Sequence, residues 1–297
     1  MNIMITGANG TIGSDLVEYF SKKNKIFAFY RTPNNFSRKL KNKNIYWIRH
    51  DLKKEIYHKI NPEIIIHSVV VHPFSKKDAY LDYLNSNIIA LKNVIEFAKS
   101  KKINKLFYLS SVKIYGKIQE KILTDENIFC SPDILGATKI LAEKMIELQK
   151  FSYLNIRLPG VLCYNISDSK RPWLNMIINR LIKNQKIEIH NSKNLFNNII
   201  DTYEIFKFIN HLIKKKKIIN GTINFSAIKP IKIESMIYHL KRKLFSTSKI
   251  IFNKKKTNHF IISSKKINNL YRFKISTTFQ IIDRYIDLKY NKKDRYK

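Results

Sequence analysis

Three glycines near the start of the chain constrain the fold more than any other feature. Gly7, Gly10 and Gly13 follow an apolar run at residues 2–6 and lead into a segment at residues 12–20 that includes Gly13 and whose apolar positions have helical spacing. Glycines at this spacing permit a tight turn, a close approach of backbone to a pyrophosphate, and close packing of a helix on its strand. The N-terminus of such a helix directs free N–H groups at phosphates. We therefore expect a strand, a phosphate-binding turn and a helix.

Apolar runs and helical patterns alternate along the chain up to residue 158. The expected elements are strands at 26–30, 45–48, 64–70, 106–109 and 154–158, and helices near 77–101 and 136–150. This alternation is typical of a parallel α/β sheet with right-handed crossovers. We predict a Rossmann-type, doubly wound parallel sheet in residues 1–162. Residues 163–297, with helices starting near Trp173, Thr202 and Ile233, are expected to form a smaller substrate-binding cap, interleaved with the first region.

The formal net charge of +34 first suggests a nucleic-acid or anionic membrane partner. Lysines are scattered over most surface-type positions, arginine is scarce beside lysine, and isoleucine and asparagine are abundant, which is typical of a compositional bias. Dense runs such as Lys214–Lys217 are interpreted as solvated helix ends and loops. We do not expect a nucleic-acid partner. If the lysine-rich surface did bind nucleic acid, its affinity would fall steeply as the salt concentration rises.

The cysteines and the hydrophobic pattern bear on the cellular location of the protein and on whether it has disulfides or a metal site. Cys130 and Cys163 lie far apart and outside any metal-binding spacing, which argues against a disulfide framework and a metal site. No apolar run approaches the roughly 20 residues needed to span a bilayer, and the N-terminus lacks the basic flank of a secretion signal. A cytoplasmic location without a membrane span is expected.

The end of the second predicted strand bears on the choice of cofactor. An NAD site has an acidic residue there to hold the ribose hydroxyls. This sequence has Tyr30 and Arg31 instead. Arg31 can pair with a 2′-phosphate, which favours NADP, although an arginine at this position can also be an ordinary surface residue and NAD stays open.

Further motifs follow the turn in a fixed order. They are Asp51-Leu52, Ile66-His67-Ser68, Asn87, Ser110-Ser111 with Tyr115-Gly116, Gly136-Ala137-Thr138-Lys139 with Glu143, and Arg157-Leu158-Pro159-Gly160-Val161. Together with the turn they resemble the extended short-chain dehydrogenase/reductase family, in its NAD(P)-dependent epimerase/dehydratase branch acting on nucleotide-linked sugars. The resemblance covers nearly the whole chain and implies a nucleotide-sugar substrate and a homodimer.

The resemblance also implies roles for individual residues. Ser111 would hydrogen-bond the sugar oxygen at the reacting carbon, and Lys139 would bind the nicotinamide ribose. The arginine that commonly contacts the substrate diphosphate in this family has no match here. We expect Asn197 and Asn198 to hydrogen-bond the sugar or its phosphate instead, with Arg171 or Arg180 as another source of charge. The expected cofactor-binding residues are Gly7, Asn9, Gly10, Thr11, Ile12, Gly13, Arg31, Asp51, Leu52, Ser68, Val69, Val70, Asn87, Lys139 and Pro159.

One departure from the family is chemical. The catalytic tyrosine stands four residues before the lysine in the family, and Leu135 occupies that position here. Leucine neither donates nor accepts a proton. Three interpretations stay open. Tyr115, Tyr164 or a water held by Ser111 and Lys139 moves the proton; the reaction needs less acid–base help; or the protein binds cofactor without turnover.

The sequence thus predicts an NAD(P)-dependent epimerase, dehydratase or ketosugar reductase, serving surface-polysaccharide or deoxysugar synthesis. In such a reaction the cofactor supplies the hydride, and the protein supplies positioning and proton handling. The alternative is a catalytically silent NAD(P)-binding sensor or interaction protein, which the leucine at position 135 favours.

Overall fold

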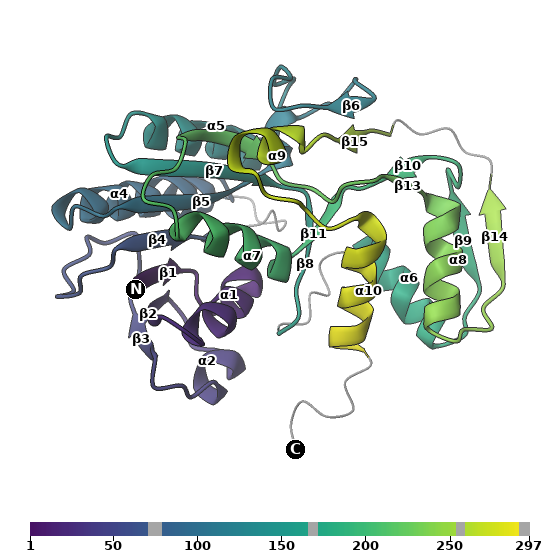
Figure 1. The fold of residues 1–297 in the computed structure, drawn as a ribbon, viewed down its shortest axis with the longest axis horizontal. Helices are drawn as coiled ribbons and strands as arrows, with labels where there is room; N and C mark the ends of the chain where they lie inside the picture. The colour runs from purple at the N-terminus through teal and green to yellow at the C-terminus, as the bar shows by residue number, and fades with distance from the viewer. Residues whose placement is uncertain (71–78, 166–171, 254–258, 291–297) are drawn as a thin grey trace.

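The computed structural model describes residues 1–70, 79–165, 172–253 and 259–290. Within these ranges, seven parallel strands form the central sheet (Figure 1). From edge to edge the strands are β12 (Gly221–Asn224), β7 (Ser152–Leu158), β5 (Lys105–Ser111), β4 (Ile64–His67), β1 (Asn2–Thr6), β2 (Lys25–Tyr30) and β3 (Ile45–Arg49). The chain order reverses its direction between β1 and β4, and ligands of such sheets bind outside the carboxyl ends of the strands at this point. The predicted doubly wound parallel sheet is confirmed.

Helices cover both faces of the sheet because its strands are apolar on both sides. The side chains of Ile3 and Ile5 on β1 pack into one core cluster with the helices α1 and α7, and Met4 between them packs into a second cluster with α4 and α5. Figure 1 shows α4 and α5 on one side of the sheet and α1 and α7 on the other. The bounds are α1 (Thr11–Ser21), α4 (Ala90–Ser100), α5 (Ile134–Glu147) and α7 (Thr202–Ile213).

Two elements differ in extent from the sequence prediction. The strand predicted at 64–70 ends at His67, where the Ser68 hydroxyl donates to the Thr6 carbonyl oxygen (2.6 Å) and the chain leaves the sheet. The helix predicted at 77–101 is divided into α3 (Ala79–Tyr83), the π-helical η1 (Leu84–Ile89) and α4. Residues 77–78 of that prediction lie outside the described residues. A π-turn reorients the side chains beyond it, and π-bulges are frequent at functional sites.

The chain after β7 builds a second lobe beside the sheet. Figure 1 shows α6, α8, α10 and the β9–β14 pair gathered there, whereas β12 returns to the central sheet. The helices predicted near Trp173, Thr202 and Ile233 are present as α6, α7 and α8. The remaining bounds are α2 (Asn35–Lys39), η2 (Val112–Tyr115), β6 (Ile122–Leu123), β8 (Gly160–Leu162), α6 (Pro172–Ile182), β9 (Ile187–His190), β10 (Leu195–Phe196), β11 (Ile199–Asp201), β13 (Ile231–Lys232), α8 (Ile233–Lys243), β14 (Ile250–Asn253), β15 (Ile261–Ile262), α9 (Lys265–Tyr271) and α10 (Thr278–Lys289).

A buried carboxylate ties α1 to this later part of the chain. Asp15 accepts hydrogen bonds from the backbone N–H groups of Tyr164 (2.7 Å) and Asn165 (2.9 Å), and from the Thr202 hydroxyl (2.5 Å). Burial raises the pKa of Asp15 to about 6, although these three donors oppose the shift. The helix that follows the glycine turn is therefore fixed to the segments on which the second lobe begins.

Two negative findings apply to the described part of the chain. None of its helices is both long and apolar enough to cross a bilayer. Its histidine, cysteine and acidic side chains form no group of three that is placed to hold a metal ion.

Candidate cofactor pocket and reaction site

The glycine turn has a conformation that side chains would prevent. Gly7 has a φ of +67°, in the left-handed region that favours glycine. A Cβ atom added at Gly13 would lie 2.1 Å from the Gly7 carbonyl oxygen. Gly10 is the N-cap of α1, no side chain caps its N–H groups, and the first turn carries no acidic residue. The N-terminal N–H groups of α1 are thus left for an anion at the turn.

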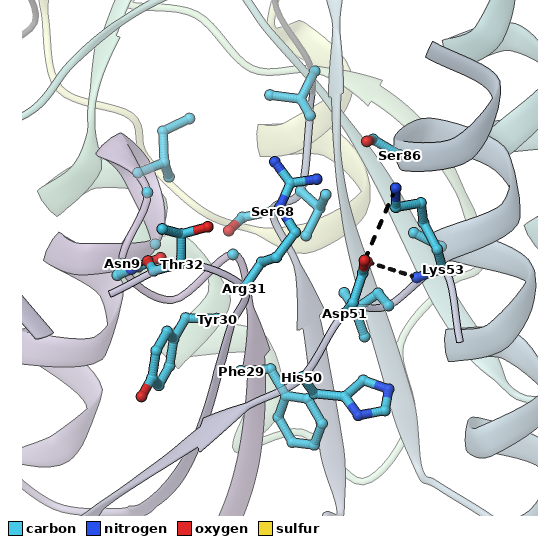
Figure 2. Close-up of a pocket in the computed structure, with 18 of the residues that line it drawn as sticks. Asn9, Phe29, Tyr30, Arg31, Thr32, His50, Asp51, Lys53, Ser68 and Ser86 are labelled. Carbon is cyan, nitrogen blue, oxygen red and sulfur yellow. Dashed lines mark hydrogen bonds and ion pairs between the residues drawn. The ribbon is translucent and has the colours of Figure 1, made fainter. Parts of the chain in front are cut away.

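A pocket of about 340 Å³ opens above this turn, at the carboxyl ends of β1, β2, β3 and β4 (Figure 2). Most of the predicted cofactor residues meet here: Gly7, Asn9, Gly10, Thr11, Ile12, Gly13, Arg31, Asp51, Leu52, Ser68, Val69 and Val70. The pocket also includes residues that sequence reasoning missed: Phe29, Tyr30, Thr32, His50, Lys53, Ser86 and Ala90. These residues share one feature that could have identified them in the sequence: they lie at or just after the end of a predicted strand, or on the helix that faces it.

Arg31 extends across this pocket from the end of β2 (Figure 2). Its neighbourhood is fixed to the glycine turn because the Asn9 side-chain amide donates to the Thr32 carbonyl oxygen (2.6 Å). Among the lining residues, Asp51 is the acidic one, and its carboxylate lies 3.9 Å from the Lys53 ammonium. The ribose end of the pocket is therefore basic and carries no acidic residue at the end of β2.

The described residues fit a nicotinamide dinucleotide. A Cβ at Gly10 would lie 3.0 Å from the Gly7 carbonyl oxygen, so bare backbone forms the floor where a pyrophosphate would lie. Uncapped N–H groups face the same place. The turn would supply the phosphate contacts, and the ends of β2 and β3 would supply the walls for an adenosine.

Lys139 lies beside this pocket but not among its lining residues. Its buried ammonium donates to the Leu109 carbonyl oxygen (3.0 Å) and lies 4.5 Å from the centre of the Tyr108 ring. Burial lowers the pKa of Lys139 to about 7, against the opposing charge of Glu143. The lysine is held by the backbone of β5 and is poised between its charged and neutral forms.

Asn87 and Pro159 also lie outside the pocket lining. The Asn87 side-chain amide is buried and donates to the Thr138 hydroxyl (3.0 Å), one residue before Lys139. Pro159 is buried between β7 and β8. Asn87 thus positions the helix that carries Lys139.

Ser111 and Leu135 come from adjoining elements. Ser111 is half-buried and caps η2, its hydroxyl oxygen accepting from the Lys113 backbone N–H (3.2 Å). Leu135 is buried in the first turn of α5, whose N-cap Asp133 accepts from the Gly136 N–H (2.8 Å). A Cβ at Gly136 would lie 2.4 Å from the Lys113 carbonyl oxygen, so α5 and η2 are in close contact. Their junction offers a serine and no phenol at position 135.

The two tyrosines considered as substitutes for the missing phenol are engaged elsewhere. The Tyr115 hydroxyl donates to Asn224 Oδ1 (2.9 Å) and accepts from Arg157 (2.8 Å), and burial raises the pKa of Tyr115 to about 12. The Tyr164 hydroxyl donates to the buried Asp201 carboxylate (2.6 Å). Both phenols are thus engaged in buried hydrogen-bond networks, which argues against a role for either one in moving the proton.

The two predicted sugar contacts have different surroundings. The Asn197 side-chain amide is 1% exposed, donates to the carbonyl oxygens of Ala227 and Ile262 (2.8 Å each) and accepts from the Ile262 N–H (2.9 Å). It cross-links three segments of backbone in this structure, and the sugar contact of Asn197 stays a prediction. Asn198 is half-buried, and its Oδ1 has no hydrogen-bond partner among the described residues. Asn198 stays a predicted substrate contact, and Arg171 lies outside the described residues.

Known structures share this fold over the whole chain. A UDP-glucuronic acid 4-epimerase from Bacillus cereus, solved in complex with NAD, has a TM-score of 0.78 at 18% identity and covers 98% of each chain. A UDP-N-acetylglucosamine 4-epimerase from Methanobrevibacter ruminantium, in complex with UDP-N-acetylmuramic acid, has a TM-score of 0.78 at 19% identity, over 96% of each chain.

Sequence comparison gives the family. Protein CapI of Staphylococcus aureus is 25% identical over 240 residues, which are 72% of this chain and 70% of CapI. A dTDP-D-glucose 4,6-dehydratase of Dictyostelium discoideum is 23% identical over 248 residues, 73% of this chain but only 56% of that enzyme. The profile of the NAD dependent epimerase/dehydratase family matches residues 3–200. The chain belongs to this family, of the extended short-chain dehydrogenase/reductase type that its motifs resemble.

Proposed function

We propose that the protein is an NADP-dependent enzyme that acts on a nucleotide-linked sugar in surface-polysaccharide or deoxysugar synthesis. The observation that carries the choice of cofactor is Arg31, which extends into the pocket where an NAD site has a carboxylate. Family membership and the sugar-nucleotide relatives support the choice of substrate. The reaction would be epimerisation, dehydration or ketosugar reduction.

Several groups have the positions and donors that this function needs. When bound, the nicotinamide supplies or takes up a hydride. An ammonium group has three N–H donors, and Lys139 gives one to Leu109, which leaves two for the ribose hydroxyls. The Ser111 hydroxyl, at the start of η2, would orient the sugar oxygen. Residues 163–297, with Asn198 among them, would hold the rest of the substrate.

Binding and turnover of the intact chain test the proposal separately. Calorimetric titration with NADPH and NADH is expected to show tighter binding of NADPH. Turnover is then followed in two assays. Loss of NADPH absorbance with UDP- and dTDP-linked ketosugars detects reduction, and chromatography of UDP- and dTDP-sugars incubated with NADP⁺ detects epimerisation and dehydration, which consume no net cofactor. A clear preference for NADH would remove the role given to Arg31, and tight NADPH binding without conversion of any sugar nucleotide in either assay would contradict the enzymatic role.

The second candidate function is a catalytically silent NAD(P)-binding protein, and Leu135 is the observation that favours it. It predicts cofactor binding at full affinity and no conversion of any sugar nucleotide. Substitution Leu135→Tyr discriminates the two, because only a silent protein gains activity from a zero baseline in that variant.

We also propose that the protein is a homodimer. Four apolar side chains between 42% and 48% exposed lie on α3, η1 and α5, which pack together: Leu81, Leu84, Ile134 and Leu141. Apolar surface grouped on adjoining helices is typical of a protein–protein interface. Light scattering after size-exclusion chromatography is expected to give twice the mass of the 35.2 kDa chain, and a monomer at all concentrations would contradict this.

A further inference from the structure

A tyrosine on the helix beside Leu135 has an unused hydroxyl. Tyr83, the last residue of α3, is 1% exposed, and its hydroxyl oxygen is buried without a hydrogen-bond partner among the described residues. A buried hydroxyl without a partner costs about 1–3 kcal/mol. Such an atom requires an explanation, and a ligand that completes the hydrogen bond is one.

The packing of the helices places Tyr83 alongside the first turn of α5. Both α3 and η1 pack against α5. Four residues after Tyr83, the Asn87 amide donates to the Thr138 hydroxyl, which in turn donates to the Leu135 carbonyl oxygen (3.0 Å). The Asp133 carboxylate, at the N-cap of α5, is close enough to Tyr83 for its charge to act on the phenol.

A second buried phenol lacks a partner but is less suited to the site. The Tyr108 hydroxyl has no hydrogen-bond partner among the described residues, and its ring contacts the Lys139 ammonium and stacks on the His67 ring. It belongs to β5 in the interior of the sheet, beneath the lysine. Tyr83 is the phenol on the element that adjoins both η1 and the start of α5.

We propose that Tyr83 donates the proton to the carbonyl oxygen of a ketosugar reduced at this site, in place of the phenol that position 135 lacks. This inference rests on the proposed function and narrows it to the reductive direction. The Tyr83 O–H bond breaks, and its proton forms the new O–H bond of the sugar alcohol. A hydride from NADPH adds to the carbonyl carbon with its electron pair, and water reprotonates the phenolate.

The electrostatics keep the proton on this phenol. Burial, and then the charge of Asp133, raises the pKa of Tyr83. Among the described residues, the Lys113 ammonium lies 3.6 Å from that carboxylate, but it is mostly exposed and screens the Asp133 charge only in part. The phenol is therefore protonated at neutral pH. Because a raised pKa also makes it a weaker acid, its proton moves only as the sugar oxygen gains negative charge from the arriving hydride.

The first test removes the hydroxyl alone. Tyr83→Phe is expected to lower kcat for ketosugar reduction by about 100-fold or more, the usual contribution of a general acid, with unchanged affinity for NADPH. Tyr80→Phe, three residues earlier and 54% exposed, is the matched control and is expected to stay within about twofold of wild type. Adding Leu135→Tyr to Tyr83→Phe is expected to restore part of the lost rate.

The second test does not depend on turnover. Ionisation of tyrosine is followed by its near-ultraviolet absorbance with and without NADP⁺, because the positive nicotinamide ring lowers the pKa of a neighbouring phenol. We expect one tyrosine to titrate at lower pH in the complex, and this change to be absent from Tyr83→Phe and present in Tyr80→Phe.

The outcomes separate the two proposals. If wild type converts no sugar nucleotide, the proposed function fails, but a cofactor-linked tyrosine shift that Tyr83→Phe abolishes still supports Tyr83 as the phenol facing the nicotinamide. Wild-type kcat in a folded Tyr83→Phe protein, or a cofactor-linked shift that persists in it, overturns the inference about Tyr83.

Discussion

The glycine turn and the first turn of α5 lie at the same carboxyl edge of the sheet, yet they keep the family pattern to different degrees. The turn has its three glycines, an uncapped helix N-terminus and a pocket above it. The start of α5 keeps Lys139 and its support by Asn87 and Thr138 but has Leu135 in place of the phenol. Binding geometry and proton chemistry can therefore change separately within one fold.

The largest effect is expected from a single methyl group added at the glycine turn. Gly13→Ala adds one methyl group 2.1 Å from the Gly7 carbonyl oxygen, so backbone must move. We expect NADPH affinity to fall about 100-fold or more, together with a loss of roughly 3 kcal/mol in the free energy of unfolding. Gly10→Ala, whose Cβ would lie 3.0 Å from the same oxygen, is expected to have a smaller effect. Equal affinities for wild type and Gly13→Ala would show that the cofactor lies elsewhere.

Substitution of Asn197, a predicted substrate contact, tests whether its side chain stabilises the fold. Its amide makes three buried hydrogen bonds, so Asn197→Ala is expected to lower the free energy of unfolding by about 2–3 kcal/mol in denaturant titrations. Asn198→Ala is the control and is expected to change stability by less than about 1 kcal/mol. A stable Asn197→Ala protein with a raised KM for the sugar nucleotide would instead support the predicted contact between Asn197 and the substrate.

Arg31 tests the choice of cofactor. Arg31→Ala is expected to weaken NADPH binding about tenfold, since one charge-assisted hydrogen bond to a phosphate contributes about 1.5 kcal/mol. NADH affinity is expected to stay the same. Arg38→Ala, which removes an exposed arginine of α2 that does not line this pocket, is the control for net charge. Equal losses for both cofactors, or for both variants, would indicate a non-specific charge effect.

The smallest expected effect is the uptake of a fraction of a proton by Lys139 when NADPH binds. Its pKa of about 7 leaves it partly neutral near neutral pH, and an anionic cofactor favours the charged form. NADPH binding is therefore expected to take up less than about one proton, measured by calorimetry in buffers of different ionisation enthalpy. The uptake should disappear in Lys139→Met and persist in Lys113→Met, whose lysine is exposed. Buffer-independent heats in wild type would show that Lys139 does not respond to the cofactor.

The glycine turn and the first turn of α5 also differ in how much of their structure the sequence predicts. The elements from β1 to β2 were predicted to within one or two residues, because a strand, a glycine turn and an amphipathic helix depend on neighbours along the chain. Leu135 was identified by its distance from Lys139. The sequence did not predict β12, which is four residues long and pairs with β7, 67 residues earlier.

The environments of single side chains were beyond sequence reasoning. Nothing in the sequence distinguishes the buried Lys139 from the chain's many solvated lysines except its motif. The partners of Asn197 lie 30 and 65 residues away, so its neighbourhood exists only after folding. The unused Tyr83 hydroxyl is likewise a property of helix packing, and no pattern along the chain marks it.

The attachment of Asp15 gives α1 a mechanical role beyond phosphate binding. One end of this helix presents its amides to the cofactor, and its next turn holds the backbone of Tyr164 and Asn165 together with Thr202. The phosphate-binding turn and the start of the second lobe are therefore attached to the first two turns of one helix, so the position of α1 sets the spacing between them.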